Sequence, residues 1–249
     1  IYTLSLHDAL PISIHDPPEP VLATAPVDTE PVDNPVSGQP DAPDRNPIRL
    51  TKASAFKIKP VRWLWEDRVP LGEITLLPGR EGVGKSTFLA WMAAAITNGN
   101  LPGEFAGQPR SVLYAASEDA WGYTIAPRML AAGANLDLVH RVDIVEDEGP
   151  GRLTLPTHCK WLPVTAEQEK ASILMCDPIV SLVHDTINTN RAQELRKALE
   201  PLRQAGENGG FAIVALVHFN KTRDADLLSM VSGSRAWVEV ARAVIAIDE

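Results

Sequence analysis

The feature that most constrains the fold is a glycine-rich octapeptide, GREGVGKS, at residues 79–86. It follows Gly72–Leu77, a short apolar segment typical of a strand, and runs into Lys85–Thr97, which has the character of a helix. Its three glycines allow successive backbone N–H groups to turn inward around an anion, because side chains would block that approach. The run therefore predicts a phosphate-binding loop at a strand-to-helix junction.

The residues that follow the glycines have the chemistry of a nucleoside triphosphate site. Lys85 would place a positive charge against the β- and γ-phosphates, Ser86 would offer a hydroxyl to Mg²⁺, and Thr87 would donate near the α-phosphate. The start of the helix adds its positive dipole end. A plain glycine-rich turn is the alternative, but it does not explain the position between a strand and a helix. We predict binding of ATP and Mg²⁺ by Gly79, Arg80, Glu81, Gly82, Val83, Gly84, Lys85, Ser86 and Thr87.

From about Val61 onward, short apolar runs alternate with segments that have a helical pattern. Such alternation predicts an α/β fold with a mostly parallel sheet flanked by helices. The expected strands are 72–77, 111–116, 141–145, 173–176, 211–217 and 243–247, and the expected helices are 85–97, 123–132 and 190–205. A loop with one short helix is expected over 146–170, because Pro156 and Pro163 interrupt any longer helix there.

The N-terminal part of the chain has a different composition. Residues 1–14 resemble a translated sequencing adapter, so we expect them to be artefactual. Ten of the 21 prolines lie at or before Pro47, which predicts a disordered linker over 15–55. The expected ATPase domain is 56–249, truncated at its C-terminal end.

Charge and cysteine content restrict the classes of protein to consider. Residues 1–50 hold eight acidic and two basic residues, a net −6, so the remaining 199 residues carry only −3 of the total −9. This balance argues against a broad basic surface for nucleic acid. Two cysteines cannot form a disulfide framework, and no run is long enough to cross a membrane, so a cytoplasmic location without membrane contact is expected.

Two acidic residues follow predicted strands. Ligands of open parallel sheets collect beyond the carboxyl ends of the strands, where Glu118 and Asp177 would lie. Glu118 is the candidate base that orients an attacking water, and Asp177, after a wholly apolar strand, is the candidate partner of magnesium. Each has an alternative role as a cap of the next helix, shared in the first case by Asp119.

His218 follows the predicted strand 211–217, in the sequence His218-Phe219-Asn220-Lys221. This histidine could hydrogen-bond near the γ-phosphate and report its presence. A histidine that only satisfies the polar end of a strand is the alternative.

With these markers in order, the segment from about Val61 to Ile247 resembles the RecA/DnaB-class ATPases, and among them the plasmid RepA-like helicase ATPases. The stretches that carry the resemblance are residues 65–72, 79–87, 117–119, 127–134, 177–178, 218–221 and 232–234. The resemblance implies a catalytic glutamate at Glu118, a Walker B aspartate at Asp177 and a sensor at His218.

The resemblance also implies a homo-oligomeric ring, usually of six subunits, in which a cation reaches the neighbour's ATP site. Arg242 matches the position of that finger, and Lys221 and Arg235 are weaker candidates. A surface ion pair is the alternative for Arg242. Single-stranded DNA would meet the inner rim at His184–Arg191 and Lys221–Met230, although these loops hold few basic residues.

The resulting hypothesis is an ATP-hydrolysing subunit of a DNA helicase or translocase of a plasmid, phage or mobile element. The second hypothesis is a regulatory ATPase without motor activity, whose ATP-dependent assembly binds a protein partner. A kinase is disfavoured because no arginine-rich lid is visible and because Glu118 suits a water nucleophile.

Overall fold

The computed structural model describes residues 2–5, 49–58, 60–146, 149–218 and 235–247. Its contacts divide the chain into two units, Ala9–Pro60 and a larger unit formed by Ile1–Asp8 with Val61–Glu249. In the smaller unit, the described residues form one 3₁₀ turn, η1 (Ala53–Ala55), without a buried side chain. Most of the linker expected over 15–55 lies outside the described residues, so that expectation stays a prediction.

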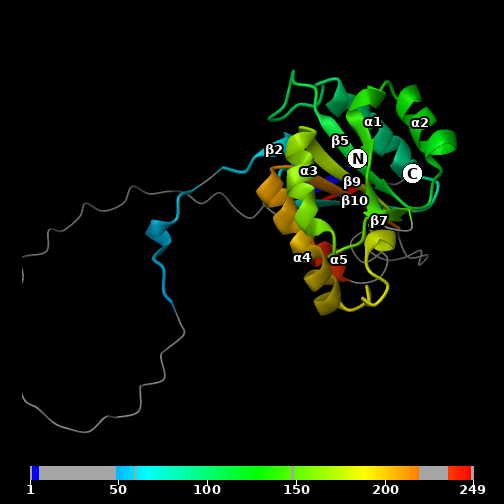
Figure 1. The fold of residues 1–249 in the computed structure, drawn as a ribbon. Coiled ribbons are helices and arrows are strands. Elements are labelled where there is room, and N and C mark those ends of the chain that lie inside the picture. Colours follow the sequence, from blue (N-terminus) through cyan, green and yellow to red (C-terminus); the bar gives the residue numbers. More distant parts are fainter. Residues whose placement is uncertain (1, 6–48, 59, 147–148, 219–234, 248–249) are drawn as a thin grey trace, which may run out of the picture. The chain divides into compact units, whose positions relative to one another are not determined.

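The larger unit is built on a seven-stranded sheet in the order β1-β11-β4-β10-β9-β5-β6 (Figure 1). The six strands from β11 to β6 run parallel, which confirms the predicted α/β class. The strands are β1 (Tyr2–Ser5), β4 (Ile74–Gly79), β5 (Ser111–Ala116), β6 (Val139–Arg141), β9 (Ala171–Asp177), β10 (Ala212–His218) and β11 (Ala243–Ala246).

The strand β1 comes from the piece expected to be artefactual. It pairs antiparallel with β11, in the register Tyr2 to Ala246 through Ser5 to Ala243, and forms the edge of the sheet. The artefactual origin of residues 1–14 stays a prediction, because pairing at an edge does not depend on where a sequence comes from.

Helices cover both faces of the sheet (Figure 1). One face is packed by α1 and α2 with the β2-β3 hairpin, and the other by α3, α4 and α5. The helices are α1 (Lys85–Thr97), α2 (Ala126–Ala131), α3 (Leu162–Gln168), α4 (Ala192–Gly209) and α5 (Arg235–Val240). Short turns are η2 (Trp121–Ile125, a π-helical turn), η3 (Leu136–Leu138), η4 (Cys159–Trp161) and η5 (Ile179–Leu182). The described residues also form two hairpins, β2 (Trp63–Trp65) with β3 (Val69–Pro70) and β7 (Asp143–Glu146) with β8 (Gly149–Arg152).

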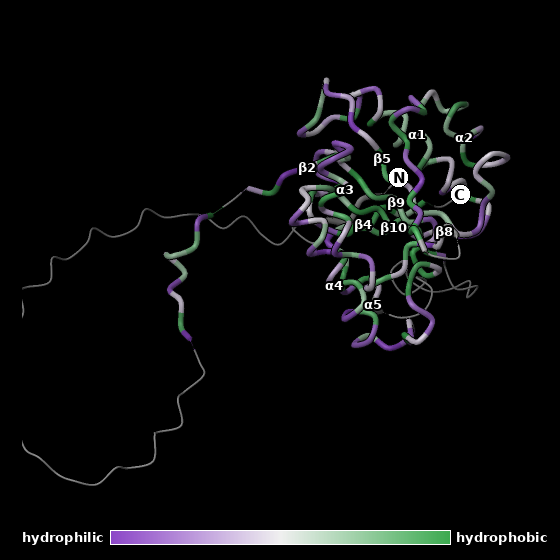
Figure 2. Tube along the Cα trace, viewed as in Figure 1, coloured by the Kyte–Doolittle hydropathy of each residue, from purple (hydrophilic) through white to green (hydrophobic). Residues whose placement is uncertain are grey.

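The central strands are buried on both sides, which is why their sequences are continuous apolar runs rather than alternating ones. In β9, for example, Ile173 and Met175 pack toward α1, whereas Leu174 and Cys176 pack toward α4. Figure 2 shows β4, β9 and β10 as a hydrophobic centre inside a more polar periphery.

Several predicted elements need correction. The strand expected at 141–145 is two strands: Val139–Arg141 joins the sheet as β6, and Asp143–Glu146 pairs with Gly149–Arg152 in a separate hairpin. The loop expected over 146–170 contains β8 as well as the expected short helix, α3. Pro163 is accommodated in the first turn of α3, where its missing N–H has no intrahelical partner to lose.

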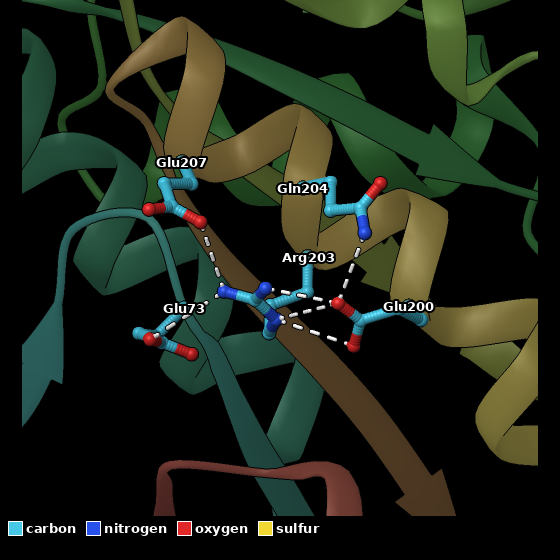
Figure 3. A network of polar contacts seen from close by, with 5 residues as sticks. All are labelled: Glu73, Glu200, Arg203, Gln204 and Glu207. Atoms are coloured by element: carbon cyan, nitrogen blue, oxygen red, sulfur yellow. Dashed lines mark hydrogen bonds and ion pairs between the residues drawn. The ribbon is translucent and has the colours of Figure 1, made fainter. Parts of the chain in front are cut away.

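Arg203 on α4 connects that helix to the segment before β4 (Figure 3). Its guanidinium lies between three carboxylates, at 2.9 Å from Glu200, 3.1 Å from Glu207 and 3.9 Å from Glu73. Gln204 donates to Glu200 at 3.1 Å. The network lies at the end of the sheet opposite to the glycine-rich loop.

Candidate nucleotide site

The strand order creates a crevice at the carboxyl ends of the strands. After β4 the chain crosses α1 to β5, which is separated from β4 by β9 and β10, and it later returns to place β11 on the other side of β4. Such a reversal of direction opens a crevice above the sheet. The glycine-rich loop follows β4 directly, so the fold places it in this crevice.

Each glycine of the loop is required for a physical reason. Gly82 and Gly84 adopt φ of +83° and +88°, a left-handed conformation that strains other residues. A Cβ on Gly79 would lie 2.9 Å from the carbonyl oxygen of Ile247 and 3.1 Å from the Lys85 side chain. The loop therefore needs backbone freedom at two positions and empty space at the third.

Lys85 begins α1, and only 5% of it is exposed. Its ammonium donates to the carbonyl oxygen of Gly79 at 2.7 Å and to that of Arg80. Burial lowers the pKa of Lys85, and the carboxylates of Asp177 and Glu81 oppose that shift. The loop thus holds a largely buried cation against its own carbonyl oxygens.

A cavity of about 320 Å³ gathers most of the predicted site residues from four strand ends. It is lined by Glu81, Gly82, Gly84, Lys85, Ser86, Thr87, Glu118, Asp119, Arg128, Asp177, Leu216 and His218. Gly79, Arg80 and Val83 belong to the loop but do not line this cavity. The predicted candidates Lys85, Ser86, Glu118, Asp177 and His218 therefore share one site, although their roles stay predictions.

Asp177 is the last residue of β9 and is half-buried. The hydroxyl of Tyr114 donates to its Oδ2 at 2.6 Å. The turn that follows, η5, has Pro178 as its cap and receives no side-chain capping bond, so Asp177 does not act as a helix cap. One carboxylate oxygen is thus oriented by Tyr114, and the carboxylate itself lines the cavity.

Glu118 and Asp119 follow β5 in an exposed segment. The hydroxyl of Ser181 donates to Glu118 at 3.4 Å, and Arg128 contacts Asp119 at 3.2 Å. The next turn, η2, begins after Ala120 without a side-chain capping bond. The capping alternative is therefore not observed for either acid.

His218 ends β10 in register with Gly79 of β4. Its Nδ1 is buried and has no hydrogen-bond partner among the described residues. A buried polar atom without a partner is costly, and His218 is one of the residues that line the cavity.

Arg242 lies away from this cavity. Its backbone N–H donates to the carbonyl oxygen of Ile74 at 2.8 Å, at the first residue of β4, whereas the loop follows the last. Five residue-to-residue steps along β4 separate Ile74 from Gly79, about 16 Å. Lys221 and the Arg235 side chain lie outside the described residues, as does the predicted DNA-contacting loop Lys221–Met230.

Sequence reasoning assigned no role to Tyr114 or Arg128, both of which belong to the site. Tyr114 lies inside an apolar strand, and its burial is the main reason why its pKa is raised well above the usual value of a phenol. A polar-tipped aromatic residue in a buried strand is the signal that could have indicated a partner. Arg128 gave no such signal, because an arginine on a short helix is ordinary.

The oxygen donors at the cavity fit a magnesium ion. Ser86 supplies a hydroxyl and Asp177 a carboxylate, both hard ligands of the kind that Mg²⁺ takes together with water and phosphate oxygens. The described residues contain no cluster of three or more His, Cys, Asp or Glu side chains suited to holding a metal alone. This donor set suits an ion that arrives with phosphates.

Comparison with known proteins gives one family. A family model described as an AAA domain, AAA_25, matches residues 40–224. No curated protein matches the chain. Among the described residues, no helix combines the length and the apolar character needed to span a membrane.

Proposed function

Because this chain belongs to the AAA_25 family of AAA domains, whose members are RecA-like P-loop ATPases, we propose that it uses ATP hydrolysis in a ring-forming DNA helicase or translocase. The family assignment makes the chain a nucleotide-binding NTP hydrolase. The motor role, the replication context, the hexameric ring and the role of each side chain belong to the proposal.

The observation that carries the proposal is that one cavity is lined by the loop cation, an acid beyond β5, an acid at the end of β9 and a histidine at the end of β10. Phosphoryl transfer needs positioning and charge stabilisation rather than covalent catalysis by the protein. Lys85 and the loop amides bind the phosphates, Glu118 orients the attacking water, and His218 contacts the terminal phosphate.

Ser86 and Asp177 would hold Mg²⁺, which neutralises charge on the phosphates when it is bound. Tyr114 fixes the orientation of Asp177 through its 2.6 Å hydrogen bond. Outer partners of this kind position a ligand for the ion, and they affect its affinity as well as the rate.

A cation from a neighbouring subunit completes the proposed site. Arg242 immediately precedes β11, at the end of the sheet opposite to the cavity of its own subunit. This position is compatible with action on the cavity of a neighbouring subunit. A cation that arrives with assembly makes hydrolysis depend on ring formation.

One observation favours the second candidate function, a regulatory ATPase that binds a protein partner. In the proposed DNA-contacting loop His184–Arg191, Arg191 contacts Glu194 at 3.1 Å, and Asp185 contacts Arg152 at 2.9 Å. A loop whose basic side chain is already paired with an acid offers little attraction to a phosphate backbone.

The test measures ATPase rate with and without single-stranded DNA, together with the mass of the assembled particle. Stimulation of a hexamer supports the motor, and an assembled particle whose rate is unaffected by DNA supports the regulatory ATPase. Lys85→Ala should abolish nucleotide binding or turnover, whereas Glu118→Gln should bind ATP without hydrolysing it. Normal turnover by the second variant would remove Glu118 from the proposed chemistry.

A further inference from the structure

The cavity contains a second cation besides Lys85. Arg128, on α2, lines it together with four carboxylates, those of Glu81, Glu118, Asp119 and Asp177. The phosphates of ATP would bring several more negative charges into this acidic setting. Each positive group of the lining therefore has a large effect on whether a triphosphate can bind.

Arg128 is held by a contact that can be exchanged. Its Nη1 lies 3.2 Å from Oδ2 of Asp119, and the two side chains are 32% and 44% exposed. A partly exposed pair with a single contact contributes at most about 1 kcal/mol. A guanidinium has five N–H donors, and a phosphate can accept two of them in parallel, which a single carboxylate contact does not match.

The neighbourhood places Arg128 on the side of the cavity where Glu118 lies. Asp119 is the residue after Glu118, and the π-helical turn η2 connects this segment to α2. Trp121 of that turn packs edge-on against Tyr114, with ring centroids 5.8 Å apart.

We propose that Arg128 recognises the terminal phosphate of ATP within its own subunit, and that Asp119 competes with this phosphate for the guanidinium. The inference rests on the proposed function, which assigns the cavity to ATP and the side near Glu118 to the terminal phosphate. A diphosphate leaves the Asp119–Arg128 pair in place, whereas a triphosphate displaces Asp119. The two residues thus distinguish ATP from ADP.

The experiment measures the affinity of the full chain for adenylyl imidodiphosphate and for ADP, both with Mg²⁺, by calorimetry. Arg128→Ala should weaken binding of the triphosphate analogue about tenfold or more and binding of ADP less than about twofold, since one charge-assisted contact is lost in the first case alone. Arg128→Lys should fall between, because it keeps the charge without the planar fork. Arg196→Ala is the matched control, since Arg196 on α4 also has one carboxylate contact, at 3.0 Å from Glu239, outside the cavity.

Asp119→Asn separates competition from a structural role. Removal of the competitor should tighten binding of the triphosphate analogue about threefold, and this gain should disappear in the Arg128→Ala background. If both single variants weaken the binding of both nucleotides equally, the pair only connects α2 to the segment after β5, and the inference is wrong. If Asp119→Asn still tightens binding of the triphosphate analogue in the Arg128→Ala background, Asp119 only repels the nucleotide, and the inference is also wrong.

The proposed function and the inference fail in different ways. If the wild-type chain binds neither nucleotide, the assignment of the cavity to ATP is wrong. If the wild-type chain binds both and Arg128→Ala binds the triphosphate analogue equally well, only the role of Arg128 is refuted. Unchanged ADP binding by the variants shows that they are folded.

Discussion

Replacing Tyr114 by phenylalanine tests whether the buried hydroxyl positions the acid that ends β9. Tyr114 is 1% exposed, and its bond to Asp177, at 2.6 Å, is as short as a charge-assisted O–H···O⁻ bond. A hydrogen bond to a charged group contributes about 1.5–3 kcal/mol. In a domain of this size each kcal/mol shifts Tm by about 2–4 °C, so Tyr114→Phe should lower Tm by roughly 3–12 °C.

The same variant should impair the magnesium dependence of hydrolysis. Loss of a partner that orients a metal ligand typically costs about 10- to 100-fold in metal affinity or activity. The assay is ATPase rate against Mg²⁺ concentration. Tyr123→Phe is the control, because it removes the same hydroxyl from a side chain that is 93% exposed. If the two variants show the same magnesium dependence and the same kcat, Tyr114 does not position Asp177.

The pH dependence of stability gives an independent check of the Tyr114 environment. Burial raises the pKa of Tyr114 above its usual value of 10.0, so the folded chain holds this proton more tightly than the unfolded chain does. The stability linked to it is complete below pH 10 and is lost as pH rises through the folded pKa. The difference in Tm between wild type and Tyr114→Phe should therefore shrink above pH 10, and a difference that grows there would contradict the argument.

Three further predictions concern the loop, the network on α4 and assembly. Gly84→Ala should cost about 1–2 kcal/mol of stability and weaken ATP binding, because the φ angle of Gly84 is +88°. Gly122→Ala is the control and should be tolerated, because Gly122 also has open space for a Cβ but no positive φ. Equal Tm values and ATP affinities of the two variants would refute this prediction. Glu73→Gln should raise Tm at pH 7 but not below pH 4.5, since burial raises the pKa of Glu73 and the charged form is disfavoured in the folded chain; a lower Tm at pH 7 would contradict it. Arg242→Ala should lose ATPase activity yet regain part of it in rings mixed with Glu118→Gln subunits, and the absence of any rescue would count against action on a neighbour.

Local patterns in the sequence predicted the elements that carry the loop. Lys85–Thr97 and Ser111–Ala116 have the expected bounds, because apolar runs there begin and end at clear signals. The strand before the loop was misplaced by two residues. Gly72 has a positive φ and its N–H donates to the carbonyl oxygen of Phe211, so β4 begins only at Ile74. At the other end, Pro78 suggested that the strand stops, but Pro78 and Gly79 continue it and pair with β10.

The composition of the site was predicted only where its residues follow strands. Glu118, Asp177 and His218 meet because parallel strands end at one edge, a rule that needs no knowledge of strand order. The partners Tyr114 and Arg128 depend on which strands and helices are neighbours in space. Tyr114 reaches Asp177 across the β5–β9 pairing, and no pattern within either strand specifies that register.

The location of β10 between β4 and β9 determines what can bridge the loop and Asp177. Two strand intervals set the ends of β4 and β9 about 10 Å apart, and the loop after β4 brings Lys85 and Ser86 to the cavity that Asp177 also lines. Leu216 and His218 point from β10 into the intervening space, two residues apart and hence on one side of the strand. Insertion or deletion of one residue before Leu216 would turn the following side chains of β10 to the opposite face, so Leu216 and His218 would both leave this space.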